Sequence, residues 1–194
     1  MQSNSFKNFN DAMLAEQVWC LLKNQDSLFF KFFKSKYFPH GLVLDAKDNK
    51  WSFAWKSILK GRELIKCGLK WRIGNGSQVR IFHDAWFPGS QQGKVLSPVS
   101  ESHANALVYS LINHDDRCWK VAEIDRLFLP DEAATIKAIP LSLFDQTDLP
   151  FWPYTRDGVF SVKSGYHHLM ELKETKLNGA TNVGITSPVW KAIW

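Results

Sequence analysis

The spacing of apolar residues changes along the chain, and this change constrains the fold more than any other feature of the sequence. Up to residue 68 the apolar side chains recur every three or four residues, which is the period of a helix with one buried face. From residue 70 they alternate in short runs broken by glycine and proline, which is the period of strands. We therefore expect an α+β protein, mainly helical, with short helices, two β-hairpins and two small lobes.

Capping residues locate the predicted helices. Asn10 or Asp11 can begin a helix that continues to residue 23, and Ser27 can begin a second helix that ends before Pro39. Ser52 can begin a third, with Gly68 as its left-handed stop. Further helices are expected over residues 104–112, 119–128, 130–139 and 164–173.

Turn residues locate the predicted hairpins and the boundary between the lobes. One hairpin is expected over residues 70–82, because the Asn75-Gly76 pair readily adopts the positive φ of a tight turn. A second is expected over residues 151–162, around Asp157-Gly158. Residues 89–93 predict a flexible joint. The expected division is a basic helical lobe with a β-hairpin over 1–89, a second small α+β lobe over 90–173, and a separate segment over 174–194.

Composition narrows the class of protein. The 194 residues, 45% of them hydrophobic and 22% charged, suit one or two globular domains. No apolar run approaches the roughly 20 residues of a membrane-spanning helix, and the first residues lack the apolar stretch of a secretory signal. Cys20, Cys67 and Cys118 are too few and too far apart for a disulfide framework or a zinc site. We expect an intracellular protein, nuclear or cytoplasmic and not secreted, with no membrane partner, no metal and no cofactor.

Positive charge is concentrated in one stretch. Residues 31–80 hold twelve of the chain's 24 basic residues but only three of its 19 acidic ones. Such a cluster is typical of a surface that binds a polyanion, because each neutralised phosphate releases counterions. A solvated surface that keeps the domain soluble explains the charge equally well. The candidate contacts with an RNA or DNA backbone, without sequence specificity, are Lys31, Lys34, Lys36, Lys56, Lys60, Arg62, Lys66, Lys70, Arg72 and Arg80.

The chemistry-bearing residues do not predict an enzyme. The acidic pair at 115–116 falls in a predicted turn, and the pair at 131–132 opens a predicted helix, where negative charge is favourable. We interpret residues 83–84, a His-Asp pair, as a turn with local hydrogen bonds, and the two histidines at 167–168 as part of an amphipathic helix. The glycines of 74–76 are interpreted as turn residues. The paired carboxylates that two-metal polymerase or ribonuclease chemistry needs are missing from these patterns.

Nine tryptophans are the other informative excess. Several lie beside a lysine or arginine, as in Lys70-Trp71-Arg72, and such pairs can stack bases while the cations hold phosphates. However, Trp55 lies on the apolar stripe of its predicted helix, and Trp71 shares a face with Ile73. We therefore expect core packing for the tryptophans and nucleic-acid contact for the lysines among them.

Seven short strings follow one another in order from residue 6 to residue 194. They include KYFP at 36–39, WRIGNG at 71–76, HDAW at 83–86 and DGVFSVKSGY at 157–166, and the others cover 6–19, 52–62 and 189–194. In this order and spacing they resemble the C-terminal region of plant LINE-type (non-LTR) retrotransposon reverse transcriptases, just before the zinc-binding domain.

The resemblance implies a non-catalytic segment of an RNA-directed DNA polymerase polyprotein, downstream of its catalytic palm. Within the segment 174–194, the Thr, Asn and Gly of residues 174–187 predict a linker. The resemblance implies that the last residues of this segment are the truncated start of the zinc-binding region, which in the family is often followed by a ribonuclease H domain. The remainder of the polyprotein is then an expected partner. Two positions depart from the family pattern, Glu16 where a basic residue is usual and Cys20 where arginine is usual. Both changes remove positive charge, as in a decayed copy.

Three hypotheses follow. The leading one is a non-catalytic fragment that contacts RNA or DNA backbone through the basic surface. The second is a degenerate open reading frame whose product is marginally folded and has no activity of its own. The third is a protein-interaction module that uses Trp190 and Trp194 as anchors.

Overall fold

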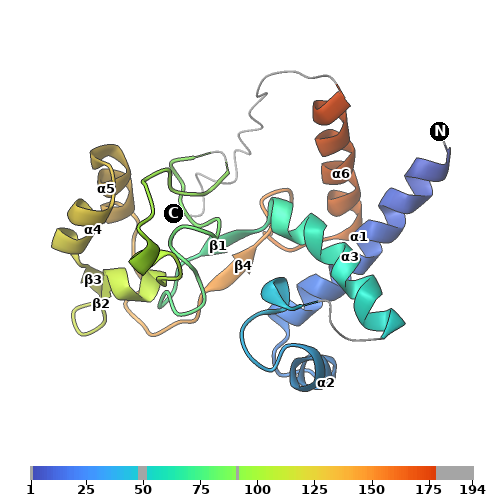
Figure 1. Ribbon diagram of the computed structural model, residues 1–194, viewed down its shortest axis with the longest axis horizontal. Coiled ribbons are helices and arrows are strands. Elements are labelled where there is room, and N and C mark those ends of the chain that lie inside the picture. Colours follow the sequence, from blue (N-terminus) through green and yellow to red (C-terminus); the bar gives the residue numbers. More distant parts are fainter. Residues whose placement is uncertain (1, 48–51, 91, 178–194) are drawn as a thin grey trace. The chain divides into compact units, whose positions relative to one another are not determined.

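The computed structural model describes residues 2–47, 52–90 and 92–177 (Figure 1). The described residues form helices and a few short strands, which confirms the predicted mainly helical α+β class. They divide into two compact units, of which unit 1 contains residues 2–69 and 152–177 and unit 2 contains residues 70–151. Unit 1 is therefore discontinuous in sequence, whereas the expected division fell after residue 89. The strings at 189–194, including Trp190 and Trp194, lie outside the described residues.

Unit 1 is built around helix α1 (Gln2–Lys23), which packs against α3 (Phe53–Gly68) and α6 (Val162–Leu177) (Figure 1). The contact between α1 and α3 is close because Gly61 has no side chain. A Cβ at that position would lie 2.3 Å from backbone atoms of Leu14 and Ala15. Ala15 is fully buried at the crossing, and the larger side chains of Val18 and Ile65 are fully buried on the two helices. Small residues at the crossing thus allow large ones to close the core.

The helix starts at Ser27 and Ser52 are confirmed. The Ser27 hydroxyl accepts a hydrogen bond from the backbone N–H of Phe30 at 3.1 Å and begins α2 (Leu28–Tyr37). The Ser52 hydroxyl accepts one from the N–H of Trp55 at 3.4 Å. The predicted left-handed stop at Gly68 is wrong, because Gly68 is the last residue of α3 and does not have a positive φ. Its lack of a side chain instead admits a ring, since a Cβ there would lie 2.5 Å from Trp152.

Trp152 belongs to the C-terminal part of unit 1 and is buried in the core of that unit. The side chain is fully buried, and its ring centroid lies 6.5 Å from that of Trp19 and 4.8 Å from that of Phe160. Its indole N–H donates to the hydroxyl of Ser164 at 3.0 Å. The hydroxyl of Ser161 accepts from the N–H of Ser164, so α6 begins at residue 162, two residues before the predicted start.

Unit 2 has two small antiparallel sheets, two helices and two short 3₁₀ helices. Its core contains Trp86 and Trp119, whose rings stack at 6.4 Å, together with Ile81, Ile124 and Ile136. The strand pairs are β1 (Lys70–Arg72) with β4 (Leu149–Phe151) and β2 (Ile112–Asn113) with β3 (Cys118–Trp119). The helices of unit 2 are η2 (Glu101–His103), η3 (Val108–Leu111), α4 (Val121–Leu127) and α5 (Pro130–Lys137). Unit 1 also has a short 3₁₀ helix, η1 (Val43–Asp45), which follows α2.

Both predicted hairpins are wrong. Lys70 pairs with Phe151, not with a residue near 80, and residue 80 forms an isolated bridge to Leu107. The first hairpin fails because the backbone N–H groups of residues 74, 76 and 78 bind a carboxylate and are not available to a neighbouring strand. The second fails because residues 149–151 pair with β1 and residue 162 begins α6, which leaves a single turn closed by the bond from Trp152 N–H to Gly158 O.

Two other segments differ from expectation. The predicted helix over 104–112 is replaced by η3 and β2, because Ala106 and Val108 form backbone hydrogen bonds with residues 81 and 79. The predicted joint around residues 89–93 lies inside unit 2. The Ser90 hydroxyl there accepts from the N–H of Lys94, and the N–H of Phe87 donates to Gly93 O at 2.7 Å.

Candidate nucleic-acid interface

Seven of the ten predicted contact residues lie on two helices of unit 1. Helices α2 and α3 carry these seven side chains and a single acidic residue, Glu63. The other three belong to unit 2, so the set is split between the units. The group in unit 1 is Lys31, Lys34, Lys36, Lys56, Lys60, Arg62 and Lys66, and the group in unit 2 is Lys70, Arg72 and Arg80.

An aromatic cluster holds α2 against α3. Trp55 of α3 is fully buried, and its ring centroid lies 5.9 Å from Phe33, 4.6 Å from Tyr37 and 5.8 Å from Phe38. Full burial of a large apolar side chain contributes roughly 1.5–3 kcal/mol. The cluster therefore fixes which face of α2 is turned inward, and with it which face meets solvent.

The solvent-facing side of α2 mixes apolar and cationic side chains. It consists of Leu28, Lys31, Phe32, Ser35 and Lys36, and we call it the α2 face. Leu28 is 85% exposed and Phe32 is 56% exposed. The ammonium of Lys36 lies 5.6 Å from the ring centroid of Phe32, which is a cation–π distance. The helix has no acidic residue, so nothing within α2 neutralises this face.

In unit 1, the predicted contact residues Lys34 and Arg62 are engaged in the fold. The ammonium of Lys34 donates to Gly41 O at 2.6 Å and lies 5.4 Å from the ring of Phe38. The guanidinium of Arg62 donates to Ala46 O and contacts the carboxylate of Glu63 at 3.4 Å. These bonds attach residues 41–46, which follow α2, to α2 and α3. Both side chains therefore stabilise the fold, whether or not they also contact a ligand.

The remaining lysines of α3 are exposed. Lys56 and Lys60 lie one helical turn apart, and Lys66 follows near the end of the helix. All three meet solvent and can contact a phosphate, and the carboxylate of Glu63, the acidic residue of α3, contacts the guanidinium of Arg62.

The three basic residues of unit 2 differ from one another. Lys70 is largely buried, and burial together with the nearby ammonium of Lys94 lowers its pKa to about 8. Arg80 forms two hydrogen bonds from its guanidinium to Asp84, at 2.9 and 3.1 Å, so its charge is neutralised locally. Arg72 is exposed on β1.

The tryptophans that the structure describes are core residues, as expected. All six that the structure describes are buried, so they cannot present a ring to a base without unfolding. On α2 and α3 the exposed rings are phenylalanines, which were not singled out from the sequence, with Phe29 at 37%, Phe32 at 56% and Phe53 at 91%. Helical spacing predicts the exposure of Phe32, because it lies one turn from Leu28 and one turn from Lys36. The buried Phe33 and Tyr37 lie on another side of α2.

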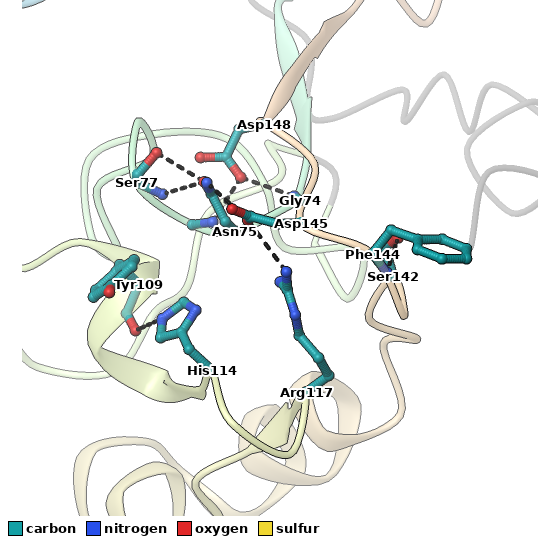
Figure 2. A network of polar contacts seen from close by, with 11 residues as sticks. Gly74, Asn75, Ser77, Tyr109, His114, Arg117, Ser142, Phe144, Asp145 and Asp148 are labelled. Carbon is teal, nitrogen blue, oxygen red and sulfur yellow. Dashed lines mark hydrogen bonds and ion pairs between the residues drawn. The ribbon is translucent and has the colours of Figure 1, made fainter.

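The WRIGNG string folds around a buried carboxylate (Figure 2). Asp148 is 3% exposed, and its Oδ1 accepts hydrogen bonds from the N–H groups of Gly74 and Gly76, both at 2.8 Å. Its Oδ2 accepts from the N–H of Gln78 at 2.8 Å. A Cβ at Gly74 would lie 2.3 Å from the backbone oxygen of residue 146, and Gly76 has a φ of +74°. The glycines are thus turn residues, as predicted, and Asp148 is the partner that the sequence did not reveal.

A second carboxylate of the same loop is exposed. Asp145 accepts a hydrogen bond from the amide of Asn75 at 3.4 Å and lies 3.3 Å from the guanidinium of Arg117 (Figure 2). Arg117 has a φ of +52°, and its side chain is 18% exposed, whereas that of Asp145 is 74% exposed. Asp145 and Asp148 therefore differ in burial although only two residues separate them.

The acidic residues that could suggest catalysis have structural partners. Asp116 accepts from the amide of Asn113 at 2.7 Å within the turn between β2 and β3. The buried carboxylate of Glu132 accepts from the N–H groups of residues 96 and 97 and from the Ser97 hydroxyl. Asp84 accepts from the N–H of Arg80 at 2.7 Å, which confirms the local turn at 83–84.

His168 is a buried aromatic contact of unit 1. Its ring centroid lies 4.0 Å from that of Tyr154 and 5.7 Å from that of Trp152. Among the described residues neither ring nitrogen has a hydrogen-bond partner, and burial lowers the pKa of the imidazole to about 4. The group is therefore neutral at pH 7, in keeping with a core role for this histidine.

Residues 2–47, 52–90 and 92–177 contain neither a metal-binding cluster nor a membrane-spanning helix. No three His, Cys, Asp or Glu side chains gather there in a group that could hold a metal ion. None of the helices in this part of the chain combines the length and apolarity required to cross a membrane.

The chain is similar to two proteins of Arabidopsis thaliana. It is 28% identical over 169 residues, 84% of the chain, to one named "Putative ribonuclease H protein". It is 35% identical over 79 residues, 40% of the chain, to one named "Uncharacterized mitochondrial protein". The chain spans 27% of the first relative and 51% of the second. No family model and no solved structure matches the chain.

Proposed function

We propose that the chain is a non-catalytic part of a plant LINE-type (non-LTR) retrotransposon polyprotein and that it binds RNA or DNA backbone through the lysines of α2 and α3. Two findings support the retroelement origin: the order of the seven strings, and the similarity over 84% of the chain to a plant protein named for ribonuclease H. The remainder of that polyprotein is the proposed protein partner, and the proposed compartment is the nucleus or the cytoplasm.

The observation that carries the binding proposal is the charge on α2 and α3. Seven basic residues and one acidic residue occupy two helices of one unit, and five of the lysines are exposed. Phosphates are contacted by such ammonium groups as point charges, which positions a strand without reading its sequence. The five exposed lysines are Lys31, Lys36, Lys56, Lys60 and Lys66.

Salt dependence tests this proposal directly. If all five lysines contact phosphates, the logarithm of the association constant for single-stranded RNA should fall with the logarithm of salt concentration with a slope of about −3.5, at about −0.7 per phosphate. Fluorescence anisotropy between about 50 and 200 mM salt measures the slope. Absence of binding at low salt, or a slope near zero, would refute the proposal.

A matched pair of variants separates this surface from net charge. Substitution of Lys31, Lys56 and Lys60 by glutamine should weaken binding strongly and make the slope shallower by about 2. The control substitutes Lys23, Lys120 and Lys163, which are exposed lysines outside α2 and α3, and removes the same charge. Equal losses in the two variants would show that binding depends on overall charge only.

The absence of catalysis is part of the proposal. It is supported by the structural partners of Asp84, Glu132 and Asp148, which hold backbone N–H groups. Incubation of the purified chain with an RNA–DNA hybrid and Mg²⁺, and separately with a primed RNA template and nucleotides, tests it. Cleavage or primer extension that co-purifies with the chain would overturn it.

A second candidate function, protein–protein contact, is favoured by one observation on α1. Phe6, Phe9 and Met13 recur at helical spacing and are 76%, 51% and 48% exposed. Exposed apolar stripes of this kind are typical of interaction sites. Light scattering of the wild-type chain and of a Phe9→Ser variant would reveal self-association through this stripe.

A further inference from the structure

The α2 face combines a solvent-exposed ring with cationic groups, and this combination is more specific than charge alone. Phe32 is 56% exposed although the neighbouring Phe33 and Tyr37 are buried. Lys31 precedes it, and the ammonium of Lys36 lies 5.6 Å from its ring centroid. Single exposed apolar side chains are common on protein surfaces, so the informative feature is the pairing of this ring with the ammonium of Lys36.

We propose that the α2 face binds single-stranded nucleic acid by stacking a base on the Phe32 ring while Lys31 and Lys36 hold the adjoining phosphates. This inference rests on the proposed function and narrows it from any polyanion to an unpaired strand. Successive nucleotides alternate a flat π-surface with a negative charge, and the α2 face alternates a ring with ammonium groups. Stacking on an aromatic ring tolerates any base, so it needs no sequence-specific readout.

The position of Phe32 favours an unpaired strand over a duplex. In a duplex the base faces are covered by neighbouring base pairs, so a ring on a protein surface meets only backbone and base edges. The six described tryptophans are buried and cannot supply the stacking surface. Of the exposed rings on α2, Phe32 is the more exposed and the one with an ammonium over it.

The same features argue against an anionic membrane surface as the occupant. A membrane-bound helix buries its apolar face about 5–10 Å below the headgroups. The Lys36 ammonium lies 5.6 Å from the centroid of the Phe32 ring, so insertion of the ring would either draw the ammonium toward the apolar region or break this cation–π contact. Charged groups are costly to move into the apolar region. A nucleotide instead leaves the ammonium in water, beside the phosphate.

The test compares three variants of the full chain, each first checked for an unchanged circular dichroism spectrum and melting temperature. Phe32→Leu removes the ring and keeps an apolar side chain, and Phe32→Trp enlarges the ring. The control, Phe144→Leu, alters a phenylalanine that is 74% exposed in unit 2, beside the acidic Asp145. The probe is a labelled single-stranded RNA of about 15 nucleotides, a length in the range of single-strand binding sites. A duplex of the same sequence serves as the second probe.

Phe32→Leu should weaken binding of the single strand about five- to a hundredfold, whereas binding of the duplex should change less than about twofold. Phe32→Trp should restore or exceed wild-type affinity, and Phe144→Leu should have no effect. Equal losses for single strand and duplex, or no loss with Phe32→Leu while the lysine variants lose affinity, would overturn base stacking and leave the proposed function standing. No RNA binding by the wild-type chain at low salt would overturn both.

A vesicle assay gives the remaining outcome. Co-sedimentation with phosphatidylserine vesicles should be weak and insensitive to Phe32→Leu. Strong co-sedimentation that Phe32→Leu abolishes, with RNA affinity unchanged, would show that lipid is the occupant and would overturn the proposal.

Discussion

Substitution of Asp148 by asparagine is expected to be the most informative change in unit 2. The carboxylate accepts three hydrogen bonds from buried or half-buried backbone N–H groups, of Gly74, Gly76 and Gln78. In the Asp148→Asn variant the amide oxygen can retain two of them as weaker neutral bonds, while the third N–H faces an NH₂ group. Loss of one bond and of the charge on the other two gives a destabilisation of about 3 kcal/mol, since bonds to charged groups contribute roughly 1.5–3 kcal/mol and neutral ones roughly 0.5–1.5.

Such a loss is large relative to the roughly 5–15 kcal/mol by which most domains are stable. Hydrogen exchange measured by mass spectrometry on peptides covering residues 73–80 should report it as about a hundredfold faster exchange, at about 1.4 kcal/mol per tenfold change. Chemical denaturation followed by tryptophan fluorescence gives an independent measurement.

The matched control lies in the same loop. Asp145→Asn removes the same charge from an exposed carboxylate with contacts of 3.3 and 3.4 Å, so its cost should be less than about 0.5 kcal/mol. If the Asp148→Asn variant unfolds at the same denaturant concentration as the Asp145→Asn variant, with unchanged exchange in residues 73–80, the structural role assigned to the buried carboxylate is wrong.

Three further predictions concern unit 1 and the chain as a whole. Gly61→Ala should destabilise unit 1 by about 1–3 kcal/mol. The added Cβ would clash with the backbone of α1, and this cost exceeds the gain of about 1 kcal/mol in helix propensity. A denaturation midpoint at or above that of the wild type would contradict the prediction. The imidazole of His168 has its pKa lowered to about 4 by burial, so the unfolded state binds more protons between pH 6.5 and 4. The free energy of unfolding should therefore decrease as pH falls through this window. Thermal melting of a His168→Phe variant should show a flatter dependence of melting temperature on pH. Equal dependences in the two proteins would show that His168 is not the source of the acid sensitivity. Limited proteolysis should leave resistant fragments containing α1 with α3, whereas rapid loss of all fragments would favour the marginally folded product of a degenerate reading frame.

Only some local features of the fold could be predicted from the sequence, since α1 begins at Gln2, eight residues before the predicted start at Asn10, and Gly68 is not a left-handed stop. The hydroxyls of Ser27 and Ser52 cap helices as predicted, because a cap depends only on residues within one turn. The pairing of Lys70 with Phe151 was missed, because the choice of strand partner depends on Asp148, which lies more than 70 residues from the turn it binds. Local turn signals around Gly76 were correct, but they could not show which chain segment lies beside β1.

The candidate site could be predicted only in part for the same reason. Charge counting finds the lysines of α2 and α3, but it does not show that Lys34 and Arg62 bond to backbone oxygens. Nor does it show that Arg80 is paired with Asp84. The exposed position of Phe32 follows from helical period once the inner face of α2 is known, and that face is set by contact with α3.

Antiparallel pairing of β1 with β4 brings both ends of unit 2 together, since Lys70 lies opposite Phe151. Unit 2 is therefore an insertion whose entry and exit points are neighbours, interrupting a helical unit at residues 69 and 152. Because entry and exit lie opposite each other on paired strands, a change of length inside unit 2 leaves the spacing between its two ends unaltered as long as β1 stays paired with β4.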